Sequence, residues 1–181
     1  MLKPTLEGEL VRLRPIEARD AGGLWEIVDD AESRRLTGQT AVFSRAEIEV
    51  WCREVSGRER RIDLAVTAGG SDEFLGQIVL AGIDEARGCA DLSLSMRPCT
   101  RGRGYGSDSI GLVLGLAFDG LGLHRVGLDV LSINVRAHAL YEGMGFRVEG
   151  RRRDAYRDGD GWCDAIEMGI LDDEYRTGQA A

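Results

Sequence analysis

A glycine-rich stretch in the second half of the chain has the residue types and spacing of a phosphate-binding loop. Arg101–Ser107 reads R-G-R-G-Y-G-S and follows the alternating apolar run Leu92–Met96. Apolar residues then recur at the spacing of one helical face, at Ile110, Val113, Leu114, Ala117, Phe118 and Leu121. Glycines let the backbone turn sharply and approach a ligand, while the unpaired N–H groups of a helix start attract an anion. The pattern predicts a phosphate or pyrophosphate site.

Two known phosphate-binding designs fit this stretch poorly. A Walker P-loop needs a Lys before Ser or Thr, and the only Lys in the chain is Lys3. A dinucleotide-binding fingerprint needs a third Gly where Ser109 stands. Asp129 lies roughly where the ribose-binding acid of that fingerprint would be, so a dinucleotide-binding oxidoreductase domain stays a distant alternative.

Three motifs in order resemble the GNAT superfamily of N-acetyltransferases. Arg101, Gly104 and Gly106 meet the Arg/Gln-x-x-Gly-x-Gly/Ala pattern of its pyrophosphate loop. Ser132–Ala137 and Ala139–Phe146 look like its S-x-N-x-x-A and A-x-x-L-Y-x-x-x-G-F signatures. The pattern is most similar to the ribosomal-protein N-terminal acetyltransferase (RimJ/RimL-like) branch, over a core of about residues 9–171.

The resemblance implies an α+β (α/β) GNAT fold in a single domain spanning residues 1–181. We expect a mixed, mostly antiparallel sheet of about six to seven strands with a central splayed parallel pair, flanked by about four helices. A chain of 181 residues is large enough to bury roughly 70% of its unfolded surface in one core.

The residue pattern agrees with this order of elements. Alternating apolar residues predict strands at Glu9–Arg14, Ile62–Thr67, Phe74–Ala81, Cys89–Met96, Arg125–Leu131, Phe146–Glu149 and Ala165–Leu171. Helical spacing predicts helices from Asp20 through Ala31, after the capping box Ser44–Glu47, at Ser107–Leu121 and at Val135–Met144. A strand, a helix and a second strand from Cys89 to Leu131 predict a right-handed crossover and a parallel pair. Only Thr177–Ala181 reads as a frayed tail.

The resemblance also assigns roles to individual residues. It places the pyrophosphate on the loop Arg101, Gly102, Arg103, Gly104, Tyr105, Gly106 and Ser107, and the pantetheine on the backbone of Leu94 and Met96. It makes the Met96 N–H the donor to the thioester oxygen. Asn134 contacts the cofactor or is only a helix N-cap, and Tyr141 is the general acid or only a core residue. The general base is open among Asp91, Ser93 and Tyr156.

The function expected from this resemblance is transfer of an acetyl group from acetyl-CoA to a primary amine by direct attack in a ternary complex. The acceptor is a protein N-terminus or an amine-bearing small molecule such as a polyamine, an amino acid or an antibiotic. A non-catalytic acyl-CoA-binding regulatory module is the main alternative. A working acid at Tyr141 would count against that alternative.

Composition narrows the partners. A net charge of −8 disfavours a nucleic-acid binder and suits an amine-bearing partner, although plain solubility explains it too. Four cysteines without a C-x-x-C pair and two histidines predict free thiols and no metal site. Because no apolar run is long enough to span a membrane, we expect a cytoplasmic protein without a membrane partner, and a homodimer stays open.

Overall fold

The computed structural model describes residues 3–179, and all of its strands belong to one mixed sheet. The sheet has eight strands in these residues, in the order β1-β2-β3-β4-β5-β6-β8-β7. In chain order they are β1 (Leu6–Glu7), β2 (Val11–Pro15), β3 (Arg61–Ala68), β4 (Phe74–Asp84), β5 (Cys89–Met96), β6 (Arg125–Leu131), β7 (Arg147–Asp158) and β8 (Gly161–Leu171). The predicted fold class is confirmed, with β1 as the strand that the pattern did not reveal.

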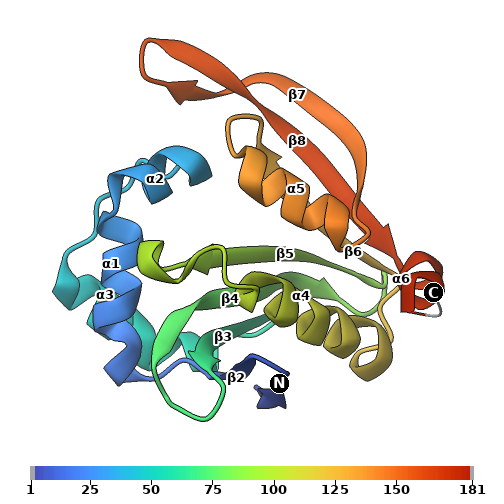
Figure 1. Cartoon of the computed structure of the whole chain (residues 1–181), viewed down its shortest axis with the longest axis horizontal. Coiled ribbons are helices and arrows are strands. Elements are labelled where there is room, and N and C mark those ends of the chain that lie inside the picture. Colours follow the sequence, from blue (N-terminus) through green and yellow to red (C-terminus); the bar gives the residue numbers. More distant parts are fainter. Residues whose placement is uncertain (1–2, 180–181) are drawn as a thin grey trace.

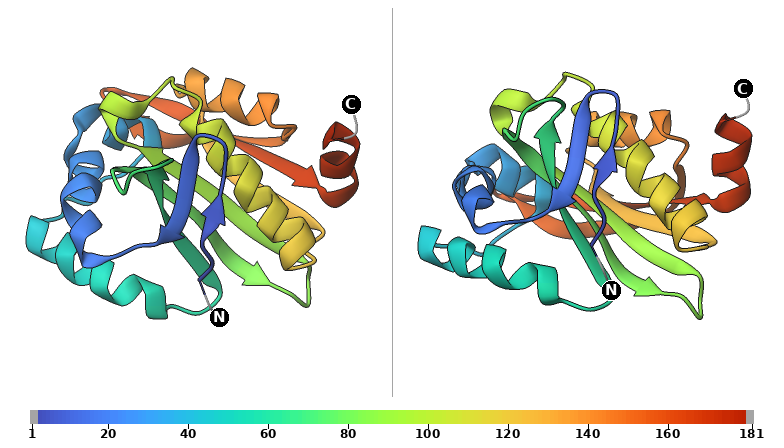
Figure 2. Two further views of the ribbon diagram at one scale, coloured as in Figure 1. Left: turned by 60° about the horizontal axis from the view of Figure 1, so that its bottom comes forward. Right: turned by 90° about the horizontal axis from the view of Figure 1, so that it is seen from below.

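Helices cover both faces of this sheet. Residues 3–179 contain six α-helices: α1 (Ala21–Asp29), α2 (Ala31–Thr37), α3 (Arg45–Glu54), α4 (Tyr105–Gly115), α5 (Val135–Gly143) and α6 (Asp172–Gln179). Short 3₁₀ turns lie at Ala18–Asp20, Val55–Gly57 and Pro98–Thr100, and a π-helical turn at Leu116–Gly120 extends α4. Helices α4 and α5 pack with the larger apolar cluster, and α1 and α3 pack with a second cluster on the opposite side of the sheet (Figure 2).

The parallel pair β5 and β6 is the feature that shapes the molecule. The two strands pair only at Cys89↔Arg125, Ala90↔Val126 and Asp91↔Gly127. Beyond Asp91, β5 pairs only with β4, and beyond Gly127, β6 pairs only with β8. The sheet therefore opens into two halves, β1–β5 and β6–β8, which diverge towards α2 (Figure 1). The predicted splay is confirmed.

Helix α4 bridges the parallel pair and closes the core. Its buried apolar residues are those of the predicted stripe, Ile110, Val113 and Leu114, with Ala117 and Phe118 in the π-helical turn. Ser109 is buried as well, and its hydroxyl donates to the Tyr105 carbonyl at 2.7 Å. The hairpin β1–β2 lies beside the start of α4 (Figure 2). It holds this end of the helix, because the Asp108 carboxylate accepts the N–H groups of Leu10 and Val11 at 2.7 and 2.9 Å. This contact fixes the first turn of α4, which directly follows the glycine loop.

Two further features of the first third of the chain differ from the sequence prediction. The helix expected through Ala31 is broken at Asp30, whose extended backbone and side chain cap α2 by accepting the Ser33 N–H at 2.8 Å. Asp20, where this helix was expected to begin, precedes α1, and its side chain does not cap the helix but binds Arg14 at 2.8 Å in a buried ion pair. Because of the break at Asp30, three α-helices (α1, α2 and α3) rather than the expected two lie between β2 and β3.

The closing hairpin β7–β8 is longer than the alternation of apolar residues suggested. Most of β7 is exposed, so its positions lack an apolar pattern, and pairing with β8 defines the strand instead. The turn Asp158–Gly161 is confirmed. Residues 177–179 belong to α6 rather than to a frayed tail, and 180–181 lie outside the described residues.

Across residues 3–179 no helix combines the length and apolar character needed to cross a membrane.

Candidate active site

The gap between β5 and β6 contains a cavity of about 350 Å³. Its lining includes the consecutive residues Leu92–Ser95 of β5 and Asp129–Leu131 of β6. Since neighbouring residues of a strand point to opposite faces of a sheet, a lining of consecutive residues means that the strand edges themselves face the cavity. We call this space the first cavity.

A second cavity of about 340 Å³ adjoins the first and extends towards the glycine loop. It is lined by Leu94, Ser95 and Met96 of β5, by Arg101, and by the start of α5. The two cavities share lining residues from α1, α2, β5 and α5 with its N-cap: Ile27, Ser33, Leu36, Thr37, Leu94, Ser95, Asn134, Ala137 and Tyr141. The two spaces thus form one bent cleft, with Tyr141 where they meet.

Tyr141 combines burial with access to this cleft. It is only 6% exposed, and its ring packs against Phe146 with 5.7 Å between centroids. Among the described residues its hydroxyl has no hydrogen-bond partner. Burial raises the pKa of Tyr141 to about 12, because the phenolate would lose its hydration. The phenol therefore keeps its proton at neutral pH and can donate it to a group in the cleft.

The glycine loop has the backbone geometry of an anion site. Gly104 is the N-cap residue of α4 with φ 82°, a left-handed conformation that suits glycine. The N–H groups of Tyr105, Gly106 and Ser107 have no hydrogen-bond partner among residues 3–179. Gly102 is also left-handed, with φ 75°, and Arg103 beside it is exposed. Three free donors at the start of a helix match the predicted pyrophosphate cradle.

Arg101 makes contacts that its motif did not suggest. Its guanidinium donates to Ser33 Oγ at 2.6 Å and to Glu32 at 3.1 Å, and Nε donates to the Met96 carbonyl at 3.3 Å. Asp30 lies 3.7 Å away. The side chain thus connects the end of β5 to α2, and its guanidinium is engaged by protein groups, whereas the backbone N–H groups at the start of α4 are not.

Helix α2 contributes lining residues to both cavities and so covers one side of the cleft, and we call it the roof of the cleft. Two further contacts hold it in place. Asn134 caps α5 by accepting the Ala137 N–H at 3.2 Å, and its amide donates to the Leu36 carbonyl at 3.3 Å. Arg35 binds Asp158 near the tip of β7 through two hydrogen bonds of 2.6 and 2.8 Å. The Arg35 guanidinium holds the pKa of Asp158 below its usual value. The cap predicted for Asn134 is therefore present, and its amide also reaches the roof.

The remaining predicted residues fall into three groups. Leu94 and Met96 line the cleft from β5, and Tyr105 opens α4 and packs against the larger cluster. Of the possible bases, Ser93 and Tyr156 line the first cavity. Asp91 does not line it, because Asp91 lies beside Gly127 where β5 and β6 still pair.

Two charged residues that line the first cavity were not predicted from the sequence as site residues. Asp129 is its only acidic lining residue and Arg34 its only cationic one among the described residues. Asp129 occupies an outward position of an alternating strand, which was a usable signal. Arg34 could not be assigned, because α2 itself was not predicted.

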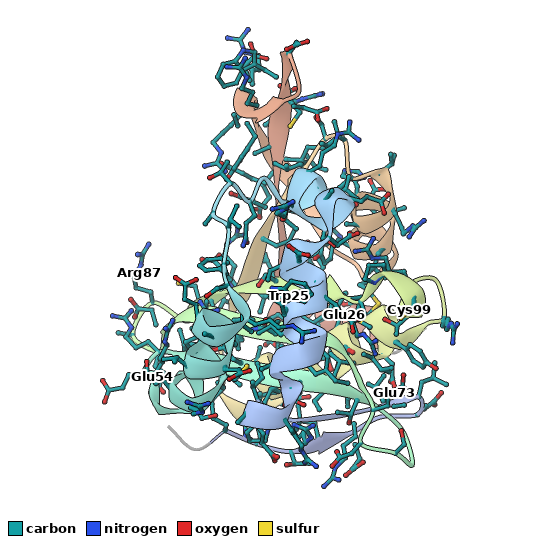
Figure 3. The ribbon with its side chains drawn as sticks, turned by 90° about the vertical axis from the view of Figure 1, so that its left-hand side faces the viewer. Trp25, Glu26, Glu54, Glu73, Arg87 and Cys99 are labelled. Carbon is teal, nitrogen blue, oxygen red and sulfur yellow. The ribbon has the colours of Figure 1, made fainter. Side chains whose placement is uncertain are left out.

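A third cavity lies apart from this cleft, on the outer side of α1. It measures about 330 Å³ and is lined by Trp25, Glu26, Asp29, Asp30, Pro98 and Cys99. Figure 3 shows Trp25 and Glu26 on the outward side of α1, with Cys99 beside them. This space shares no lining residue with the first or second cavity. In residues 3–179 no three His, Cys, Asp or Glu side chains gather as a metal site requires.

Known proteins of similar sequence are acetyltransferases. The family model described as acetyltransferase (GNAT) domain matches residues 11–147. The uncharacterised N-acetyltransferase p20 of Bacillus licheniformis is 25% identical over 176 residues, which cover 94% of this chain and 98% of that protein. The spermidine N(1)-acetyltransferase of Escherichia coli strain K12 is 23% identical, covering 91% of this chain and 88% of that protein.

Solved structures have the same fold. A GNAT-family acetyltransferase from Bacillus anthracis superimposes with a TM-score of 0.82 at 20% identity, covering 94% of this chain and 99% of that chain. The spermidine N-acetyltransferase of Vibrio cholerae, solved in complex with CoA and spermine, gives a TM-score of 0.82 at 22% identity, covering 92% and 98%.

The contacts of Arg101 predict that its side chain stabilises α2. In Arg101→Ala, hydrogen exchange at the backbone amides of residues 34–39 should be at least about tenfold faster, because hydrogen bonds from a charged group contribute roughly 1.5–3 kcal/mol. Hydrogen exchange read by mass spectrometry measures this. Arg103→Ala, a change to an exposed arginine of the same loop, is the control and should leave α2 unaffected. Equal exchange in both variants would show that α2 is held without Arg101.

Proposed function

This chain belongs to the GNAT family of acetyltransferases, and we propose that it transfers an acetyl group from acetyl-CoA to a primary amine bound in the first cavity. One observation carries the proposal: Tyr141 lies, still protonated, where the first and second cavities meet in the gap between β5 and β6. One arm of the cleft leads to the glycine loop and can hold the cofactor, and the other can hold the acceptor.

The second cavity and the loop fit acetyl-CoA. The free N–H groups of Tyr105, Gly106 and Ser107 would hold the pyrophosphate, and the unpaired edge of β5 at Leu94 and Met96 would offer backbone groups to the pantetheine amides. A Met96 N–H on the thioester oxygen would stabilise negative charge there. Acetyl-CoA supplies an activated acyl group on a sulfur that leaves as a thiolate.

The acid in this proposal is Tyr141. Its hydroxyl has no competing partner among the described residues, so it is available to the sulfur of the departing thiolate. Because burial raises the pKa of Tyr141 to about 12, the hydroxyl remains protonated and stabilises the thiolate by a hydrogen bond through which its proton can move.

We propose Asp129 as the proton acceptor, a residue that was not among the bases considered from the sequence. An ammonium group must lose a proton before its nitrogen can attack, and Asp129 is the one carboxylate among the described lining residues of the first cavity. It takes the proton directly or through a water molecule. Ser93 and Tyr156, which line the same cavity, would orient the acceptor by hydrogen bonds.

Two acceptor classes follow from resemblance alone. The motif order of the RimJ/RimL-like branch suggests a protein N-terminus, and the spermidine acetyltransferases among the relatives suggest a polyamine. Both carry a primary amine, which is the one group that the reaction itself requires of the acceptor. A non-catalytic acyl-CoA-binding module would need neither Tyr141 nor Asp129 at the cleft.

The loop is tested by Gly106→Val. A Cβ at Gly106 would lie 3.1 Å from a methyl carbon of Leu94 and 3.4 Å from one of Leu140, so a valine side chain narrows the space between loop, β5 and α5. CoA affinity measured by calorimetry should fall at least about tenfold, or about 1.4 kcal/mol. Gly111→Ala on the same helix, where the new Cβ would meet only Met144 at 3.9 Å, should bind CoA like wild type. Unchanged binding by Gly106→Val would place the pyrophosphate elsewhere.

The acid is tested by Tyr141→Phe. Turnover measured by thiol release should fall by a factor near the lower end of the ~10²–10⁴-fold range that is typical of general acid catalysis. Stability should not fall, because the lost hydroxyl has no partner among the described residues. With a pKa of about 12 for Tyr141, the phenol should cause no alkaline decline of turnover below about pH 10. Turnover within twofold of wild type, with CoA binding intact, would reduce Tyr141 to a core residue.

The proton acceptor is tested by Asp129→Asn. The specificity constant for the amine should drop by ~10²–10⁴-fold, while the affinity for CoA should not change. The control is Glu167→Gln, which alters the other carboxylate paired with Arg152 but lines neither cavity. If both variants lose the same small amount of activity, the effect belongs to Arg152 and its ion pairs and not to a base at Asp129.

A further inference from the structure

The charges around the first cavity are unevenly satisfied. Asp129 accepts a hydrogen bond from the Arg152 guanidinium, so the one carboxylate of the described lining already has a cationic partner. Arg34 is half-buried, and its guanidinium has neither a hydrogen-bond partner nor an ion-pair partner among residues 3–179. The cavity therefore has an unmatched positive charge and no unmatched negative one.

Such a lining is unsuited to a polyamine. Each additional ammonium group that enters a partly buried site loses hydration and needs a carboxylate or several oxygen acceptors in return. Asp129 can serve the reacting amine, but the described lining of the first cavity has no second carboxylate for a second or third ammonium. Repulsion from Arg34 would add to that cost.

An anionic group is what the unpartnered guanidinium would bind. Arginine presents a planar set of donors that matches a carboxylate through two parallel hydrogen bonds. The backbone of Arg34 is held in place for such binding, because α2 is fixed by Arg101, Asn134 and the Arg35–Asp158 pair. Gln39, which also lines the first cavity, offers a further amide N–H donor, whereas the Thr37 hydroxyl already donates to the Ser33 carbonyl at 2.8 Å.

We propose that the acceptor is a small primary amine that also carries a carboxylate, with the carboxylate bound by Arg34 and the amine placed at Asp129 and Tyr141. The inference rests on the proposed function, since it concerns the acceptor arm of the same cleft. A volume of about 350 Å³ lies near the lower end of the ~300–1,000 Å³ typical of small-ligand pockets, which suits a molecule of amino-acid or dipeptide size.

The test compares amines that differ only in the anionic group. Thiol release is measured with β-alanine and its amide, with glycylglycine and its amide, and with spermidine. For the wild-type chain each carboxylate should have a kcat/KM at least tenfold above that of its amide, and spermidine should be the poorest acceptor. In Arg34→Gln the ratio should approach one, mainly through a higher KM for the carboxylates, and Arg34→Lys should restore part of the preference.

Controls separate this inference from the proposed function. Arg53→Gln, on α3 and outside both cavities, should keep the wild-type ratio, and the KM for acetyl-CoA should be the same in all variants. Turnover without a carboxylate preference, or a preference that survives Arg34→Gln, would overturn the inference and leave the acetyltransferase assignment intact. CoA binding without turnover of any amine would overturn the proposed function, and the inference with it.

Discussion

The loss of pairing between β5 and β6 beyond Asp91 and Gly127 is the constraint on which the rest of the structure depends. A sheet edge with unpaired backbone groups is costly when it is buried, so a gap in the middle of a sheet persists only if each strand is held on its other side. Strand β4 holds β5 and strand β8 holds β6 along their full lengths. The backbone edges that remain free are then available to an extended ligand.

The gap also brings together side chains from opposite faces of the sheet. Tyr141 packs with the larger cluster on the face of α4 and α5, while Asp129 alternates with the buried Leu128 and Val130 and so points to the other face. In a continuous sheet these two groups would be separated by the backbone layer. Because the strands diverge, a single cavity is lined by both, so the acid and the base that we propose would reach one reaction from two sides.

Arginine contacts hold the roof of this cleft in a chain of net charge −8. Arg101 ties α2 to the end of β5, and Arg35 ties it to β7. Both contacts join segments distant in sequence, and both arginines line the second cavity. The position of α2 therefore depends on the same loop that we propose to hold the pyrophosphate, and Arg34 between these anchors is placed by them.

The sequence alone predicted strands β2 to β8, helices α1, α3, α4 and α5, the glycine loop, the cap at Asn134 and the parallel pair, because these follow from local periodicity and from residues that favour particular backbone conformations. It did not reveal α2, the full length of β7 or the charged lining of the cleft. These depend on contacts between distant segments, such as Arg101 with Ser33 or Arg35 with Asp158, which leave no periodic trace. The folded arrangement alone shows that the Arg101 side chain supports α2. It also shows that Asp129 is paired with Arg152, whereas the Arg34 guanidinium has no ionic partner among the described residues.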